Sequence, residues 1–307
     1  MSDTAVRPAE IAVPRLTTKG MRGWWKDPWR RPRILAAFTW GYLAWSILPV
    51  LIAIGLSFNA GRSNTQLQTL GLRWWINDPD NGGLFQDPDL RTAMIQTYRL
   101  SFATMMIAVP LGVAFAIGID RWRGRLAQGA SFLMLLTFVL PEIIIGVAMQ
   151  QVFRHLLKVV SLGTTAQVLG LVTYQISYPV IIVRARLLSI GKEYEEAGMD
   201  LGATPRQSIR RVLLPLLYPA IFASFAIVFA DTVDDFVTVR YLSGQSATEP
   251  LAIKIYSVAR SAPTPAVNAA ASFMLITTTI VIALGYVAYK RANRGQGGAD
   301  MAAFTQL

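Results

Sequence analysis

The feature that most limits the possible folds of this chain is a series of long apolar runs with few or no charged residues. Runs that approach or exceed about 18 residues are candidate membrane spans, because a helix crosses the hydrocarbon core with its own backbone hydrogen bonds satisfied. The predicted spans are residues 34–58, 93–119, 126–149, 167–183, 216–241 and 267–288. We therefore expect an all-α, polytopic membrane protein with about six transmembrane helices.

Composition supports this class and excludes others. Apolar residues make up 53% of the 307 residues, and charged residues only 15%. Cysteine is absent and His155 is the single histidine, so thiolate metal sites are excluded, and neither a histidine-rich metal centre nor a Ser/His/Asp triad is expected. The chain also lacks a Gly-x-x-x-x-Gly-Lys-Ser/Thr loop, so we expect no cofactor here and no ATP binding by that device.

Both ends of the chain are polar. Residues 1–33 combine Trp24, Trp25 and Trp29 with Lys and Arg, a mixture that favours a membrane interface with anionic lipid. No apolar stretch near the start marks a removable signal peptide. A nucleic-acid-binding arm is the less favoured interpretation, and we expect no nucleic-acid partner. The expected organisation is this tail, a transmembrane domain over 34–290, and a disordered tail over 291–307.

The distribution of charge predicts the orientation. If both termini are cytoplasmic, six spans place the loop at Arg121 and the polar segment around residue 200 on that side too. The cytoplasmic side then holds twenty of the 29 Lys and Arg residues and half of the 18 acids, which accounts for the whole net charge of +11. This distribution satisfies the positive-inside rule.

A polar segment between the fourth and fifth predicted spans has the pattern of two short helices. Residues 194–201 include good helix formers, and Gly202 stands where a helix would end. Thr204 is a suitable N-cap, and Pro205 suits the first turn of a second helix. The segment is too short for a separate domain, so we expect a helix, a turn and another helix.

This segment also resembles a known motif. Glu196-Ala197-Gly198, three further residues, Gly202, nine residues, Val212, and then Leu214-Pro215 resemble the EAA loop of ABC importer permeases. Gly198 replaces the second alanine of that pattern, and Val212 replaces isoleucine. The resemblance implies a type I importer permease fold, in which a cytoplasmic coupling loop at about 187–215 docks through a short helix on a separate ATPase that binds ATP and Mg. The docking residues implied are Glu195, Glu196, Ala197, Gly198, Asp200, Gly202, Ala203, Leu214 and Pro215. An interfacial helix without a partner is the alternative.

Acidic and aromatic residues within the spans are candidates for a substrate path. Asp231, Asp234 and Asp235 are spaced to share one helix face, roughly 22–29 Å along the fifth span. Acids are costly in a membrane unless they face a cavity or a partner, so a cationic substrate is one interpretation. Pairing with Arg240 or a partner's arginine, or exposure to outer water, is another. Glu142, after Pro141, either lines the same cavity or lies at a simple kink. Tyr174 and Tyr178 either present ring faces to an ammonium group or only pack.

Two further classes of function are weighed against transport. An intramembrane aspartyl hydrolase needs two converging carboxylates, and side chains on one helix at these spacings are not expected to converge. A non-transporting membrane scaffold would bind a partner at the loop alone. We therefore expect no enzyme activity in this chain.

Three other stretches narrow the resemblance to the second permease of spermidine/putrescine-type importers, over about residues 48–290. They are residues 72–75 with 84–88, then 234–237, then 250–256 leading to 265–269. The resemblance implies a bacterial inner-membrane protein that pairs with a second permease, two ATPase subunits and an extracytoplasmic binding protein. Gln96-Thr97 and Arg99 depart from the pattern and weaken the polyamine assignment, so another solute (iron, a sugar, an amino acid or an anion) stays open.

Overall fold

The structure is a computed structural model that describes residues 33–63, 66–76, 78–80, 82–122, 124–261 and 264–292. The tails predicted at 1–33 and 291–307 lie almost entirely outside the described residues. The chain divides into two units, residues 1–51 and 52–307. The described part of the first unit belongs to an apolar helix with Pro49 inside it.

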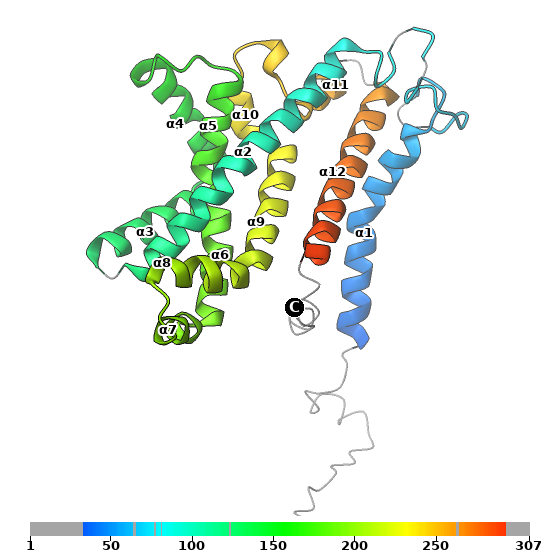
Figure 1. Ribbon diagram of the computed structural model, residues 1–307. Coiled ribbons are helices and arrows are strands. Elements are labelled where there is room, and N and C mark those ends of the chain that lie inside the picture. The colour runs from blue at the N-terminus through cyan, green and yellow to red at the C-terminus, as the bar shows by residue number, and fades with distance from the viewer. Residues whose placement is uncertain are drawn as a thin grey trace, which may run out of the picture. The chain divides into compact units, whose positions relative to one another are not determined.

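The described residues form helices joined mostly by short connections, with a longer segment between Ser57 and Pro88 (Figure 1). The helices are α1 (Arg33–Ser57), α2 (Pro88–Arg121), α3 (Arg125–Val139), α4 (Glu142–Gln151), α5 (Thr164–Gln175), α6 (Ser177–Ile190), α7 (Glu193–Asp200), α8 (Pro205–Ser208), α9 (Leu214–Asp234), α10 (Val237–Leu242), α11 (Leu251–Ser261) and α12 (Pro265–Ala292). π-Helical turns at Val152–Leu156 and Ile209–Leu213 follow α4 and precede α9, and a 3-10 turn at Ser246–Thr248 precedes α11. The all-α fold class is confirmed.

The number of membrane spans agrees with the sequence. Within the described residues, five helical segments are long and apolar enough to cross a membrane: 35–57, 88–121, 164–190, 205–234 and 265–291. A sixth span is obtained if α3 and α4 are one broken span. The prediction of about six transmembrane helices is confirmed in this form.

The third predicted span, 126–149, is wrong as a single helix. α3 and the helix after it meet at an angle of 106°. The break falls at Leu140 and Pro141, whose ψ angles of 134° and 133° are extended. Proline lacks a backbone N–H and disfavours helical geometry at the residue before it, which explains the position of the break.

The fifth predicted span, 216–241, also differs from the structure. α9 ends at Asp234, Asp235 is extended with a ψ angle of 121°, and α10 starts anew at Val237. A backbone amide of α10 uses the Asp235 carboxylate as acceptor, since Val239 N lies 3.0 Å from Asp235 Oδ1. The acidic residue that seemed to continue the span therefore bonds to the start of the next helix.

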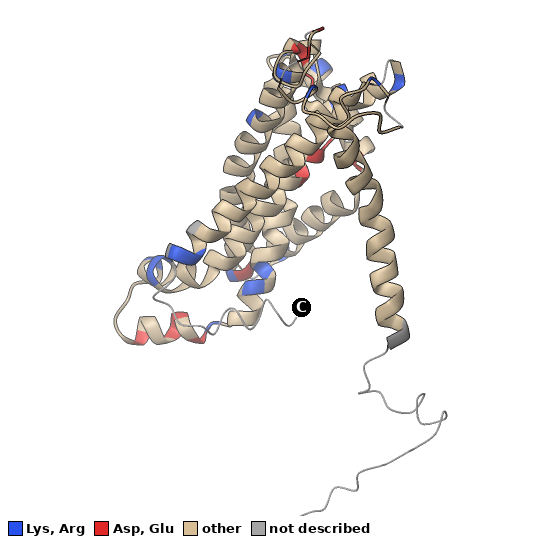
Figure 2. Cartoon of the chain, turned by 90° about the vertical axis from the view of Figure 1, so that its right-hand side faces the viewer, with Lys and Arg blue, Asp and Glu red and all other residues tan. Residues whose placement is uncertain are grey.

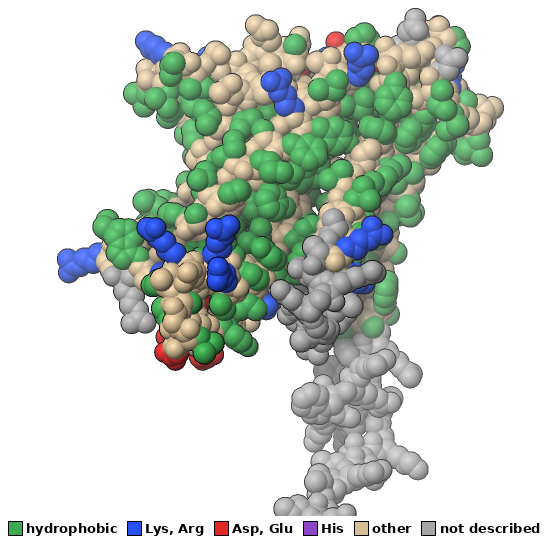
Figure 3. All heavy atoms as spheres, in the orientation of Figure 1, with side chains coloured by type: hydrophobic (Ala, Val, Ile, Leu, Met, Phe, Trp, Pro, Cys, Tyr) green, Lys and Arg blue, Asp and Glu red, His purple; other side chains and the backbone are tan. Residues whose placement is uncertain are grey.

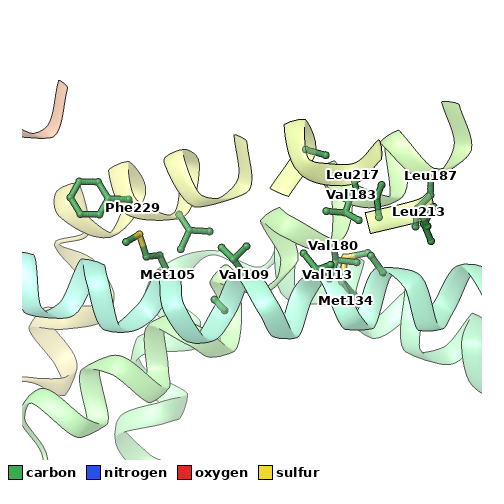
Figure 4. Close-up of a cluster of buried hydrophobic side chains, with 14 residues drawn as sticks. Met105, Val109, Val113, Met134, Val180, Val183, Leu187, Leu213, Leu217 and Phe229 are labelled. Carbon is green, nitrogen blue, oxygen red and sulfur yellow. The ribbon is translucent and has the colours of Figure 1, made fainter. Parts of the chain in front are cut away.

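The main core lies where α2, α6 and α9 pack together (Figure 4). Val109, Val180 and Leu217 are fully buried there, one from each helix. An added Cβ at Gly112 would collide with Pro179, so the glycine allows α2 and α6 to approach closely. In a bilayer these contacts stabilise the fold mainly through van der Waals packing, because lipid is as apolar as the side chains.

A second cluster joins the segment before α2 to α2, α11 and α12, and includes Trp74 and Leu84. Beside it, Asp78 is buried and accepts hydrogen bonds from Arg73 Nε at 2.5 Å and Gly82 N at 2.9 Å. Burial alone would raise the pKa of Asp78, but the hydrogen bonds and charge of Arg73, with the Gly82 amide, outweigh it and lower this pKa below its usual value.

Candidate functional site

The polar segment after α6 folds as the sequence indicates. α7 ends at Asp200, and Gly202 adopts the left-handed φ angle of 86° that favours glycine. The Thr204 hydroxyl accepts from Gln207 N at 3.4 Å, and the Gln207 side chain accepts from Thr204 N at 2.9 Å. Thr204, the N-cap of this capping box, precedes Pro205, the first residue of α8. The predicted helix, turn and second helix are confirmed.

Four of the nine predicted docking residues are exposed on this loop. Glu196, Ala197, Asp200 and Gly202 are exposed, and Gly198 and Ala203 are half-buried. Leu214 and Pro215 are half-buried at the start of α9, where they lead into the span as expected.

Three exposed apolar side chains in and just after α7, those of Tyr194, Met199 and Leu201, were not among the predicted site residues. Tyr194 is 57% exposed and Leu201 is 90% exposed. In the sequence these residues stand out only as apolar side chains between charged ones. Which of them face outward depends on how α7 packs, and the sequence alone does not show this. Together with the exposed acids they give the loop a surface suited to a partner protein.

Glu195 differs from its neighbours because it points inward. Its side chain is buried and forms an ion pair with Arg121, the last residue of α2. Arg121 also pairs with Asp120 at 2.5 Å. Ser208 Oγ donates to Glu195 O at 3.1 Å, which ties α7 to α8. Glu195 therefore connects the loop to the helix bundle, whereas the predicted docking role would place it on the outer surface.

The acids at the end of α9 do not share one helix face, so that prediction is wrong for Asp235. Asp231 is half-buried in α9, Asp234 is exposed, and Asp235 is only 6% exposed beyond the helix end. The physical reason is the helix break after Asp234, which turns the next carboxylate out of helical register.

Tyr174 brings two of these acids together. Its hydroxyl lies 2.9 Å from Asp235 Oδ2 and 3.2 Å from Asp231 Oδ2. A hydroxyl has one proton to donate, so it serves one carboxylate at a time. The expectation that the aspartates would not converge is therefore wrong, again because the helix ends between them. Two carboxylates this close repel each other, which a cation between them would relieve.

Two further side chains complete this cluster. Tyr178 OH donates to Asp231 Oδ1 at 3.3 Å, and Gln175 Nε2 donates to Asp231 Oδ2 at 3.1 Å. The tyrosines thus meet the acids through their hydroxyls rather than only offering ring faces. Gln175, which is fully buried, was missed. A glutamine among apolar residues was its only sequence signal.

The tyrosines also line a cavity. An open hollow of about 430 Å³ is lined by Phe138, Glu142, Tyr174, Tyr178 and Val237, among others. Glu142 is exposed at its wall, directly after the break between α3 and α4. Asp231 and Asp235 are not among its lining residues, but both bond to hydroxyls of the tyrosines that line it. The structure thus brings the predicted path residues together, and the exposed Asp234 is near enough for its charge to act on Asp231 and Glu142.

The other charged residues considered from the sequence lie apart from this cluster. Arg240 pairs with Glu249 at 3.0 Å, so the idea that it neutralises the aspartates is wrong. Arg99 is exposed on α2, and His155 is exposed in the π-helical turn after α4. Among the described residues, no three His, Asp or Glu side chains are grouped to hold a metal ion.

Comparison with known proteins decides the family. A family model described as "Binding-protein-dependent transport system inner membrane component" matches residues 108–296. The chain belongs to this family. It is therefore a multi-pass inner-membrane permease component, and members of this family are transport subunits rather than enzymes.

Three relatives of this permease span most of its length. The spermidine/putrescine permease protein PotC of Haemophilus influenzae is 27% identical over 84% of the chain and 96% of that relative. The putrescine permease protein PotI of Escherichia coli K12 is 28% identical over 88% of the chain and 93% of that relative. The molybdenum permease protein ModB of Mycobacterium bovis is 29% identical over 68% of the chain and 83% of that relative.

Solved structures show the same permease fold. A chain of a bacterial ABC transporter that imports the polysaccharide alginate has a TM-score of 0.67 at 17% identity, with 87% of this chain and 98% of that chain covered. A chain of the methionine transporter MetNI has a TM-score of 0.51 at 22% identity, with 68% and 94% covered. The predicted type I ABC importer permease fold is confirmed.

Proposed function

We propose that this permease carries a polyamine such as putrescine or spermidine and that a separate ATPase drives it through the loop at 187–215. The observation that carries the solute assignment is the convergence of Asp231 and Asp235 on Tyr174, beside a cavity walled by Glu142. The names of the PotC and PotI relatives support the same solute class.

The chemistry of the cluster suits an ammonium group. A primary ammonium donates hydrogen bonds and carries a positive charge, so it can replace the donors that the carboxylates now share. The rings of Phe138 and Tyr178 lie 5.7 Å apart, edge to face, at the same cavity and add aromatic surface for the cation or its methylene chain. Asp234 is exposed, so the proposal assigns the contact with the ammonium group to Asp231 and Asp235 instead.

Coupling is proposed to pass through Glu195. The exposed face of α7, with Glu196 and Asp200, is the surface offered to the ATPase, and Gly202 and Ala203 form the turn behind it. The buried Glu195–Arg121 pair then connects α7 to α2, a helix of 34 residues that is about 51 Å long. A movement imposed on the loop is thereby transmitted to a helix that crosses the whole bundle.

The remaining partners follow from the family. We propose that the chain pairs with a second permease, that two ATPase subunits bind ATP and Mg, and that an extracytoplasmic binding protein delivers the solute. One of the solved alginate transporters is in complex with a periplasmic protein that holds an alginate pentasaccharide. Both termini and the α7 loop are proposed to be cytoplasmic, which agrees with the excess of Lys and Arg at that side.

A second candidate is an oxyanion permease, favoured by the ModB relative. The carboxylates around Tyr174 disfavour it, because an anion beside them would be repelled. The test is uptake of radiolabelled putrescine by the reconstituted transporter, with spermidine, ferric ion, molybdate and a sugar as competitors. Competition by spermidine alone supports the proposal, whereas competition by molybdate, iron or the sugar contradicts it.

A further inference from the structure

The segment between α7 and α9 carries basic side chains that the proposed coupling role does not use. Arg206, Arg210 and Arg211, with Gln207, line an open hollow of about 540 Å³. All three arginines are exposed, and no ion pair in the described part of the chain involves them. Guanidinium groups gathered around one hollow repel each other, and an anion between them removes that repulsion.

The depth of this hollow follows from the helix that comes after it. α9, Leu214–Asp234, has 21 residues and is about 31 Å long, close to the thickness of a hydrocarbon core. The arginines precede it by about one to two turns of helix. They therefore lie just beyond the hydrocarbon boundary, at the level of lipid headgroups.

The order of charges along the molecule supports this depth. Figure 2 shows the acidic residues of α7 at the end of the bundle, and basic residues between that helix and the spans. The space-filling view has the same order on one face (Figure 3). The acids thus extend away from the membrane, and the basic residues lie closer to its surface.

We propose that Arg206, Arg210 and Arg211 bind the phosphate of an anionic phospholipid headgroup at the end of the coupling loop that leads into α9. Arginine suits this ligand because its planar fork donates two parallel hydrogen bonds to phosphate oxygens. Anionic phospholipid presents such phosphates at the depth of the hollow. The bound lipid holds the start of α9 at the membrane surface. The acidic residues of α7 are repelled by an anionic headgroup, so that helix stays free for a protein partner.

Lipid titration of the purified full-length chain tests this site. Phosphatidylglycerol or phosphatidylcholine is added to the chain in neutral detergent, and bound lipid is measured by native mass spectrometry. The triple substitution R206Q/R210Q/R211Q is expected to weaken phosphatidylglycerol binding at least about tenfold, since each cation contributes about fivefold near an anionic lipid. Binding of phosphatidylcholine is expected to stay unchanged.

The matched control removes the same charge elsewhere. R125Q/K290Q/R291Q changes three other exposed basic residues, and it is expected to weaken phosphatidylglycerol binding clearly less than R206Q/R210Q/R211Q does. Equal loss in both triple variants would show unspecific charge attraction and overturn the proposal. Displacement of the lipid by millimolar inorganic phosphate would assign the hollow to a free anion instead. Unchanged lipid binding with lost ATPase association would make it part of the protein interface.

The lipid measurement needs no ATPase, and it does not depend on the side of the membrane that the loop faces. The lipid proposal rests on the proposed function in one respect only: the proposed function says that the bound lipid belongs to the cytoplasmic leaflet. Failure of lipid binding therefore leaves the transport proposal standing, and a failed ATPase interaction leaves the lipid site standing.

Discussion

Tyr174, at the end of α5, holds Asp235 from the far side of the α9 break through a hydroxyl–carboxylate contact of 2.9 Å. The two residues are 61 positions apart. Both side chains are nearly buried, and Asp235 accepts from the Tyr174 hydroxyl and from Val239 N. Through this hydrogen bond, a change at the cavity-lining Tyr174 acts directly on the buried Asp235.

Removing this hydroxyl is expected to make the protein more dependent on a cation. Tyr174→Phe leaves Asp235 without that donor, which costs about 1–3 kcal/mol of stability. Because an ammonium group can replace the donor, putrescine is expected to raise the thermal unfolding temperature of the variant more than that of the parent.

Tyr98→Phe is the matched control for this measurement. Its hydroxyl bonds to Thr277 between α2 and α12 and contacts none of the acids of the cluster. Putrescine should therefore shift this variant no more than the parent. An equal shift of the Tyr174→Phe variant and the parent would contradict the cation role of the cluster.

Charge removal at the two converging acids is expected to weaken uptake of a cation. Asp231→Asn or Asp235→Asn should raise the apparent KM for putrescine about tenfold or more. Each change removes the pairing of a carboxylate with the ammonium group of the substrate in a partly dry site. Asp234→Asn, at an exposed position, should change KM less than about threefold. Initial uptake rates over a range of putrescine concentrations measure this, and three equal KM values would count against the cluster.

The glycines of the loop are expected to respond in opposite ways to alanine. An added Cβ at Gly198 would lie 3.5 Å from both Ser208 Oγ and Val212 Cγ2, an ordinary contact. Gly198→Ala should therefore stabilise α7 by about 0.5–1 kcal/mol. Gly202→Ala places a Cβ at a φ angle of 86° and should cost about 1–2 kcal/mol.

Thermal unfolding of both glycine variants checks this pair. A rise for Gly198→Ala and a fall for Gly202→Ala are expected, and the opposite order would show that the turn is not built as described.

The buried ion pair of the loop is expected to affect coupling more than ATP hydrolysis. Arg121→Gln leaves Glu195 as a buried carboxylate without its cation, so α7 is no longer held to α2. ATP hydrolysed per putrescine imported should rise several-fold, and Arg121→Lys should restore part of the coupling. Arg125→Gln, an exposed control, should leave the ratio unchanged. A loss of uptake and hydrolysis in equal proportion would instead indicate a purely structural pair.

Acid is expected to loosen the segment around Asp78. Its folded-state pKa lies below the usual value of about 4, so its contribution to stability is complete above that pH and is lost as the pH falls through the folded-state pKa. The indole of Trp74 next to it donates to Gly61 O at 3.0 Å and should report the opening. Asp78→Asn should remove this acid transition from the tryptophan fluorescence, and an unchanged transition would rule out Asp78 as its cause.

The loop could be read from the sequence because its signals are local. Gly202, Thr204 and Pro205 each act on the backbone within a few residues, and the structure places each as expected. Long apolar runs likewise indicated the spans, because apolar length alone decides whether a helix can cross a bilayer.

The site inside the membrane was harder because it depends on contacts between distant residues. Asp235 looked like part of one helical acidic face until the break after Asp234 was known. The inward direction of Glu195 depends on Arg121, which is 74 positions away. Gln175 had no periodic pattern to mark it, since its role depends on where Asp231 lies in the packed bundle.

The central claim is that Asp231 and Asp235 carry a polyamine through this permease under the power of a separate ATPase. The most direct measurement is ATP-dependent uptake of radiolabelled putrescine into proteoliposomes that contain the complete transporter and its binding protein. The account predicts saturable uptake that requires ATP and is strongly reduced by Asp231→Asn/Asp235→Asn but not by Asp234→Asn. Uptake that is unaffected by the double substitution, or transport of molybdate or a sugar in place of putrescine, would contradict it.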